Sequence, residues 1–179
     1  LMLAHHADPN VMAQDCSSPL MACVAHNDEG LVRALLEAGA VPDSLAPPEH
    51  ITQSPLHLAV INKNVAIIGM LLARNADVNA RGTGGFTPLM SAVADGSVEI
   101  TELLLRAGAR VAMEMDDGTT ALFIAARNGS HMLVRMLIEA GADVNKKTNG
   151  GLSPLHSALH MCDSQTVDVL LQNRADRSE

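Results

Sequence analysis

The chain repeats itself, and this periodicity constrains its fold more than any other feature. The five blocks that open the copies are Ser18-Pro19-Leu20-Met21, Ser54-Pro55-Leu56-His57, Thr87-Pro88-Leu89-Met90, Thr120-Ala121-Leu122-Phe123 and Ser153-Pro154-Leu155-His156. Successive blocks start 36, 33, 33 and 33 residues apart, and in every copy an Ala follows 22 residues after the first position of the block. A fixed period of this length is typical of proteins built from stacked supersecondary units.

Residues 87–109 show the local structure that one copy encodes. Thr87 is a good N-cap, and Pro88 suits the first helical position because the amide that Pro lacks has no partner there. The pattern predicts a short helix over residues 88–95 and a second helix over about residues 98–106, each followed closely by a Gly. The polar, turn-forming stretch that leads to the next copy is typical of a hairpin-like finger.

Helices this short cannot stand alone, so the copies have to bury one another's apolar faces. The chain is 47% hydrophobic but has only two Phe and neither Trp nor Tyr, which predicts a core of Leu, Ala, Val, Ile and Met. Its net charge of −8 has the wrong sign for binding phosphate, and two rings offer little for stacking on bases. Nucleic-acid binding is therefore disfavoured.

The motifs are similar to those of the ankyrin repeat family, which has a 33-residue period and a T-P-L-H-x-A signature. The segments that match closely are Ser54-Pro55-Leu56-His57-Leu58-Ala59 and Ala142-Asp143-Val144-Asn145. The resemblance implies an all-α solenoid of stacked helix-turn-helix units with β-hairpin-like fingers. It implies a single domain over residues 1–179, with a partial repeat at 1–15 and full repeats at about 16–51, 52–84, 85–117, 118–150 and 151–179.

The resemblance also implies a function, which is to bind a partner protein or peptide on the concave face without any catalysis by the chain itself. In this family the contacts come from the finger tips and the outer end of the first helix. In this sequence the corresponding positions are the residue before each N-cap, the end of each first helix and the finger tips. The expected protein-binding residues at these positions are Gln53, Phe86, Asp95, Asp116, Asp117, Thr119, Arg127, Asn128, Leu152, His160 and Met161. Phe86 and Leu152 are expected to point outward, with packing between fingers as the alternative.

A second family pattern concerns modification. Asn79 and Asn145 each follow a Val and lie eight residues after Leu71 and Leu137. This spacing is similar to the one hydroxylated on ankyrin fingers by the factor-inhibiting asparaginyl hydroxylase. We therefore expect Asn79 and Asn145 to be hydroxylation sites if the source is an animal.

Some positions depart from the family pattern. Residues 41–50 hold the three extra residues of the 36-residue spacing and three Pro, and they form either a contact loop or a tolerated surface insertion. The Gly that ends the second helix is replaced by Asn75 and Arg174. Asn tolerates left-handed backbone, whereas Arg is expected to cost about 1 kcal/mol there.

The sequence offers no catalytic constellation, and we expect no cofactor and no metal site. Residues 82–85 lack the spacing and the Lys of a phosphate-binding loop. His156 and His160 have helical spacing close to Cys162, which could suit a metal. The resemblance implies instead that His156, the fourth residue of the signature, forms a local hydrogen bond, and this is the stronger interpretation. Asn128-Gly129-Ser130 has the form of a glycosylation sequon in a tight turn between helices.

The remaining expectations concern the setting of the chain. Three Cys without C-x-x-C spacing, no signal peptide and no membrane-spanning run predict an intracellular protein, cytoplasmic, nuclear or both. The chain starts and ends within a repeat, so we expect part of a longer array, monomeric with weak end-to-end association. The alternatives are a regulatory or substrate-recruiting domain of a larger enzyme such as a ubiquitin ligase, a pathogen effector, or a structural spacer.

Overall fold

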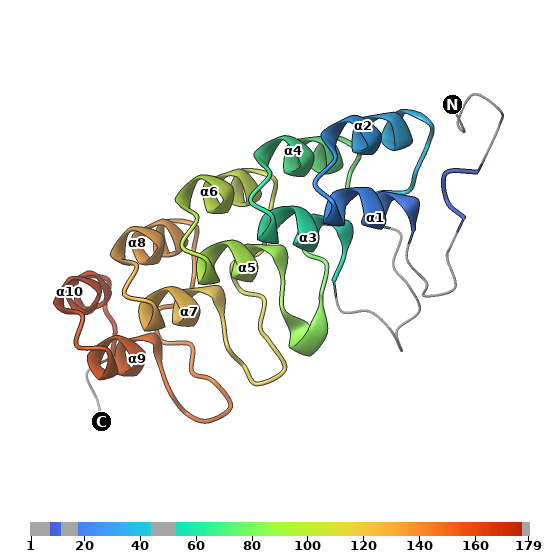
Figure 1. The fold of residues 1–179 in the computed structure, drawn as a ribbon. Helices are drawn as coiled ribbons and strands as arrows, with labels where there is room; N and C mark the ends of the chain where they lie inside the picture. The colour runs from blue at the N-terminus through green and yellow to red at the C-terminus, as the bar shows by residue number, and fades with distance from the viewer. Residues whose placement is uncertain (1–7, 12–17, 44–52, 177–179) are drawn as a thin grey trace. The chain divides into compact units, whose positions relative to one another are not determined.

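The computed structural model describes residues 8–11, 18–43 and 53–176 of the 179-residue chain. Within these residues ten α-helices alternate between seven and nine residues in length (Figure 1). The elements are α1 (Pro19–Ala25), α2 (Glu29–Glu37), α3 (Pro55–Ile61), α4 (Val65–Ala73), η2 (Thr83–Gly85), α5 (Pro88–Ala94), α6 (Val98–Arg106), α7 (Ala121–Arg127), α8 (His131–Glu139), α9 (Pro154–His160) and α10 (Ser164–Gln172). The predicted all-α helix-pair architecture is confirmed.

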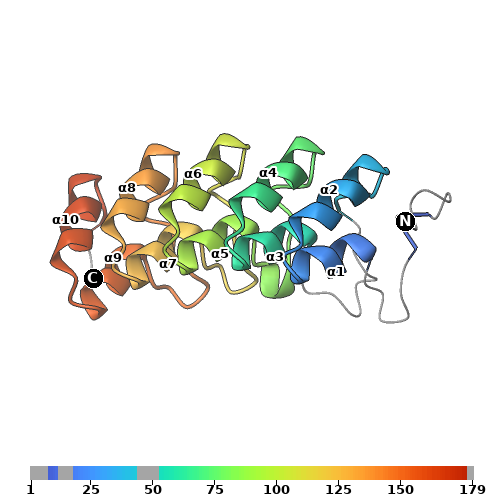
Figure 2. The same ribbon diagram turned by 45° about the horizontal axis from the view of Figure 1, so that its top comes forward.

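The chain forms two compact units, residues 1–83 with α1–α4 and residues 84–179 with α5–α10. In the first unit α1 packs against α2 and α3, and α2 packs against α4. In the second unit α5, α7 and α9 pack in succession, and so do α6, α8 and α10. Figure 2 shows the resulting row of first helices and row of second helices within each unit. The prediction of one domain over residues 1–179 stays a prediction.

The first helix of each repeat begins at the N-cap that the sequence indicates. In all five, a Ser or Thr side chain accepts a hydrogen bond from the backbone N–H three residues later. In α3 and α9 a His completes a reciprocal cap, because Ser54 N donates to His57 Nδ1 at 3.1 Å and Ser153 N donates to His156 Nδ1 at 3.2 Å. These bonds are local, which is why the helix starts were predictable.

A residue with positive φ separates the two helices of each repeat. Gly96 and Gly129 hold this position with φ of 74° and 66°, as the sequence predicted. Asn27, Lys63 and Cys162 hold the same position in the other repeats, with φ of 60°, 55° and 55°. The backbone geometry is therefore kept where the Gly is lost.

The second helices end in the same way. Gly39, Gly108 and Gly141 have φ of 91°, 90° and 92°, while Asn75 and Arg174 have φ of 60° and 67°. The predicted left-handed backbone at Arg174 is confirmed, and it is a conformation that L-residues other than Gly adopt at a cost.

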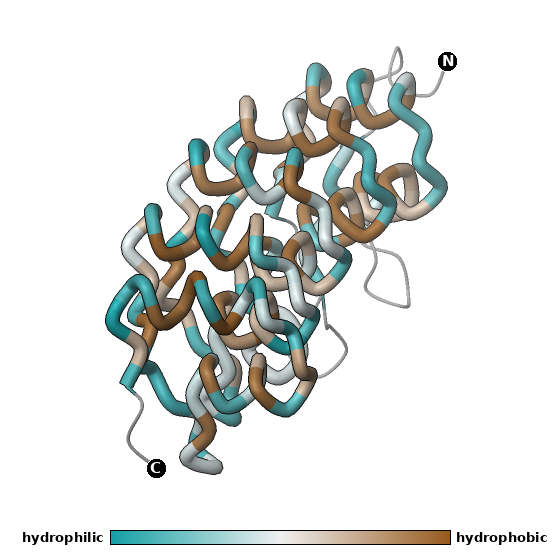
Figure 3. Tube along the Cα trace, turned by 90° about the vertical axis from the view of Figure 1, so that its left-hand side faces the viewer, coloured by the Kyte–Doolittle hydropathy of each residue, from teal (hydrophilic) through white to brown (hydrophobic). Residues whose placement is uncertain are grey.

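The core lies between the two rows of helices and contains aliphatic side chains and Met, as expected. The largest fully buried side chains of the first unit are Leu20, Leu56, Ile67, Ile68 and Leu71. Those of the second unit are Leu89, Met90, Leu104, Leu122, Ile124, Leu133 and Leu137. Figure 3 shows apolar segments along the helices and polar segments in the turns. Residues 44–50 of the expected long loop lie outside the described residues.

Candidate functional site

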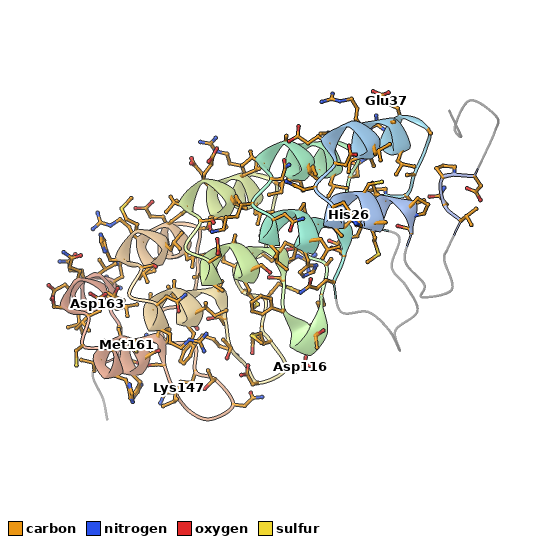
Figure 4. The ribbon with its side chains drawn as sticks, in the orientation of Figure 1. His26, Glu37, Asp116, Lys147, Met161 and Asp163 are labelled. Carbon is orange, nitrogen blue, oxygen red and sulfur yellow. The ribbon has the colours of Figure 1, made fainter. Side chains whose placement is uncertain are left out.

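The outer ends of the first helices present side chains to solvent in every repeat. The last helical residue and the residue that caps it are exposed at Ala25-His26, Ile61-Asn62, Ala94-Asp95, Arg127-Asn128 and His160-Met161. The preceding helical residues are largely buried, for example Val24, Val60, Val93 and Ala126. Of the expected binding residues, the structure thus places Asp95, Arg127, Asn128, His160 and Met161 on the surface (His26 and Met161 are labelled in Figure 4).

Two of these exposed residues also hold neighbouring repeats together. Asn62 Nδ2 donates to Val24 O at 2.9 Å, and Asn128 Nδ2 donates to Ala94 O at 3.0 Å. In both cases the amide donates to a carbonyl near the end of the preceding first helix, and Val24 O also accepts from Asn27 N at 3.0 Å. Asn128 therefore has a structural bond in addition to its exposed position.

The residues directly before the N-caps of the first helices differ in solvent exposure more than the sequence suggested. Leu152 is 51% exposed, in line with its expected outward position. Gln53 and Phe86 are half-buried, and Phe86 has an interaction partner. Thr119 is buried, with 6% exposure. Phe86 is therefore less exposed than Leu152, and its outward direction stays a prediction.

One finger of the second unit has hairpin geometry. Glu114 and Thr120 form an isolated antiparallel bridge, and Met115 N donates to Thr119 O at 2.8 Å. Asp116 and Asp117 lie exposed at its tip (Asp116 is labelled in Figure 4).

The Asp117 carboxylate is held inside this finger. Asp117 Oδ1 accepts a hydrogen bond from Thr119 N at 2.9 Å. The backbone amide of Thr119, followed by its hydroxyl, lowers the pKa of Asp117 below the ordinary value, and the charge of Arg127 acts in the same direction. The tip therefore carries a fixed negative charge at neutral pH.

Neighbouring fingers of the second unit bond to one another. Asp116 N donates to Gly84 O at 2.8 Å, and Asn149 N donates to Asp117 O at 2.8 Å. Asn149 Nδ2 adds a bond to Asp116 O at 3.0 Å, and Lys146 Nζ lies 2.9 Å from Glu114 Oε1. The finger tips thus form a bonded row that supports the exposed carboxylates.

The hollows in the described surface are shallow. One between α8 and α10, lined by Arg135 and Gln172 among others, has about 220 Å³, and one between two fingers, lined by Glu114 and Lys146 among others, has about 150 Å³. Both are smaller than the roughly 300–1,000 Å³ of typical small-molecule pockets. They suit contact with a broad surface better than enclosure of a ligand.

The described residues contain neither a cluster of metal-ligating side chains nor a helix that could span a membrane. In them, no three His, Cys, Asp or Glu side chains are grouped as metal ligands would be. His156 Nδ1 lies 2.6 Å from Ser153 Oγ inside the helix cap, while His160 and Cys162 are exposed. No helix in the described part of the chain has the length and apolar character needed to cross a bilayer.

The two Asn residues expected to be hydroxylated are half-buried in their fingers. Asn145 Nδ2 donates to Arg174 O at 3.3 Å, and Asn145 Oδ1 accepts from Asp176 N at 2.8 Å. Asn79 N donates to Asp77 Oδ1 at 2.9 Å, which fixes the turn of its finger. Hydroxylation of Asn79 and Asn145 stays a prediction.

One exposed apolar residue was not predicted from the sequence. Leu159 is 55% exposed, although the equivalent Val24, Val60, Val93 and Ala126 are at most 2% exposed. In α7 this column is covered by α9, and within the described residues no helix pair follows α10. The signal that could have found Leu159 is its position in the last repeat of the sequence.

Comparison with known proteins agrees with this architecture. The family described as "Ankyrin repeats (3 copies)" matches residues 1–82, 45–115 and 89–178. The chain is also 37% identical over 84 residues to ankyrin repeat and MYND domain-containing protein 1 of Homo sapiens. That alignment covers 45% of this chain and 9% of the human protein, so the chain spans a small part of that relative.

Ankyrin repeats are generally protein-interaction modules, and the family is typically non-catalytic. The family match extends over most of the chain, and the helix pairs with their caps and turns recur at the matching period. The chain belongs to the ankyrin repeat family.

Proposed function

We propose that this chain binds a partner protein or peptide on the face that carries the fingers and the outer ends of the first helices, the concave face implied by the resemblance. One observation supports the proposal above all others. The two positions at the end of the first helix are exposed in all five repeats, while the helical residue before them is buried in the first four repeats and exposed only at Leu159. Side chains at these positions can vary without loss of the stacked fold.

The side chains at these positions are chemically mixed, which is typical of a surface that recognises a specific partner rather than one that catalyses a reaction. In the second unit they present Asp95, Arg127, His160 and Met161, a mixture of charges, an imidazole and a thioether. The acidic tip of Asp116 and Asp117 and the net charge of −8 favour a basic or mixed segment as the partner. The chain would act by presenting a rigid surface, with little ordering cost on binding and no chemistry of its own.

Two double variants test this proposal, and each introduces residues that the third repeat already carries at the same positions. The binding-face variant, Arg127→Ala with Met161→Asp, copies Ala94 and Asp95. The control variant, Met132→Glu with Arg135→Glu, changes exposed residues of α8 to copy Glu99 and Glu102. All of these replacements are tolerated in the third repeat, so both variants should fold.

The measurement is affinity capture from a lysate of the source organism, quantified by mass spectrometry with the wild-type chain and both variants as baits. We expect a set of proteins that the wild type and the control capture and the binding-face variant loses. Equal capture by all three baits would place binding elsewhere, and loss with the control alone would move the site to the second helices.

We also propose the kind of protein that contains these repeats and its location in the cell. The name of the human relative combines ankyrin repeats with a MYND domain, which favours a multidomain parent that uses the repeats for recruitment. We place the protein inside the cell because Cys23 and Cys162 are free thiols. Immunofluorescence of the parent protein in the source organism would test that location.

A further inference from the structure

The chain contains two Asn-Gly dipeptides, Asn128-Gly129 and Asn149-Gly150. In such a pair the backbone nitrogen of Gly can attack the side-chain amide carbon of the preceding Asn, because Gly has no side chain to obstruct the approach. The reaction needs an accessible nitrogen that is not engaged as a hydrogen-bond donor. The structure separates the two dipeptides on this criterion.

Asn149 and Gly150 are the central residues of a tight turn at a finger tip. Gly151 N donates to Thr148 O at 2.9 Å and closes the turn around them. Both residues are exposed, and in the described part of the chain the Gly150 N–H has no hydrogen-bond partner. The attacking nitrogen is thus open to solvent.

Asn128 and Gly129 have the opposite arrangement. Gly129 N donates to Ala126 O at 3.2 Å, which engages the nitrogen that would have to attack. The side-chain amides do not distinguish the dipeptides, because Asn128 Nδ2 donates to Ala94 O and Asn149 Nδ2 donates to Asp116 O, each at 3.0 Å. The fold therefore protects this dipeptide in the turn between α7 and α8.

We propose that Asn149 is a site of spontaneous deamidation in the folded protein. Gly150 N loses its proton and forms a bond to Asn149 Cγ, and the side-chain nitrogen leaves as ammonia, which gives a five-membered succinimide ring. A solvent water then opens the ring at either carbonyl and leaves aspartate or isoaspartate at position 149. The net change is replacement of NH₂ by OH, without oxidation or reduction.

The product uncouples two fingers. Asn149 Nδ2 donates to Asp116 O at 3.0 Å, and a carboxylate cannot make this bond. The new charge also faces the acidic tip of Asp116 and Asp117. In the isoaspartate product the backbone gains a methylene between Asn149 Cα and Gly150 N, inside the turn that Gly151 N closes onto Thr148 O. Deamidation thus changes both the charge and the alignment of neighbouring finger tips.

The test is incubation of the whole chain at mildly alkaline pH, followed by acidic quenching and peptide mass mapping. Cleavage after Arg127, Arg135, Lys147 and Arg174 places the two dipeptides on separate peptides, residues 128–135 and 148–174. We expect residues 148–174 to gain the mass of the NH-to-O exchange and to split into aspartate and isoaspartate forms, while residues 128–135 keep their amide.

A parallel incubation in urea controls for sequence effects. Without the fold both Asn residues should react at similar rates, and faster than Asn149 does in the native chain, whose bonds to the neighbouring finger restrain it. Gly150→Ala should suppress the reaction of Asn149, and circular dichroism would check the fold. Ala fits, because Gly150 has no positive φ and a Cβ there would meet only Thr148 Oγ1, at an ordinary contact distance of 3.7 Å. Retention of the Asn149 amide, or native deamidation of Asn128 at an equal or greater rate, would overturn the proposal.

Discussion

At the residue scale, Gly118 and Gly151 distinguish two reasons why a glycine is needed. One is a backbone conformation that other residues adopt at a cost, and the other is close contact with a neighbouring finger. Gly118 and Gly151 hold the same finger position one repeat apart, with φ of 80° and 82°. A Cβ on Gly118 would lie 2.8 Å from Asn149 Oδ1 and 2.9 Å from Asn149 N, whereas a Cβ on Gly151 would meet nothing within 4 Å. The two positions share the strain but not the contact.

We therefore predict unequal losses of stability from the same substitution. Gly151→Ala should lower the free energy of unfolding by about 1 kcal/mol, the cost of left-handed backbone for an L-residue. Gly118→Ala should cost about 1–3 kcal/mol more, because a neighbouring backbone has to shift. Urea titrations followed by circular dichroism measure both values. Equal losses would show that the two fingers are not in contact in solution.

Single residues also show where sequence reasoning succeeds and where it fails. Asn75 and Arg174 were predictable as left-handed positions, because the period aligns them with Gly. The burial of Thr119 and the partial burial of Phe86 were not predictable, because their exposure depends on how closely neighbouring fingers approach. The repeat period identifies the equivalent residues of each repeat, but it does not determine how closely neighbouring fingers approach one another.

At the scale of elements, helix limits followed from local chemistry. The helices expected at residues 88–95 and 98–106 are observed as α5 and α6, with a difference of one residue at the end of α5 because Asp95 is its cap. The hydrogen bonds between fingers were beyond reach of the sequence, since they join backbone atoms about 32 residues apart, such as Asp116 N and Gly84 O.

The finger that carries Asp117 should respond to acid. The Thr119 amide lowers the pKa of Asp117 in the folded state, so its carboxylate stabilises the fold above the unfolded pKa of about 3.9 and loses this effect as pH falls through the lower folded pKa. We predict that the wild type is more stable than Asp117→Asn at pH 6, by a small amount because the group is exposed. The advantage should disappear at a pH below the folded pKa.

Thermal unfolding of both proteins across this pH range provides the measurement. Asn keeps a side-chain oxygen that can accept from Thr119 N, so the difference reports the charge rather than the bond. A difference between the two proteins that is independent of pH would contradict the assigned role of the carboxylate.

At the scale of the whole molecule, the chain forms two compact units, divided between residues 83 and 84. No sequence feature marks this division, because the same motif recurs on both sides of it. Within the second unit the last repeat differs from the others in exposing Leu159, in a column that the remaining repeats bury. An apolar side chain at this position favours association through the end of the stack.

We predict weak, reversible self-association through this end. Leu159→Gln should weaken it roughly ten- to a hundredfold, since burial of a Leu side chain contributes about 1.5–3 kcal/mol. Met132→Gln, at a residue 58% exposed on α8, is the matched control and should leave association unchanged. Sedimentation equilibrium over a range of concentrations measures the effect. A strictly monomeric wild type, or equal effects of both variants, would argue against the end contact.

The central claim is that partner binding uses the outer ends of the first helices and the finger tips. Hydrogen–deuterium exchange of the chain with and without a captured partner tests it most directly. We predict slowed exchange at residues 127–129, 160–163 and 115–118, with α6, α8 and α10 unchanged. Protection confined to the second helices would contradict the claim and place the binding surface on the opposite row.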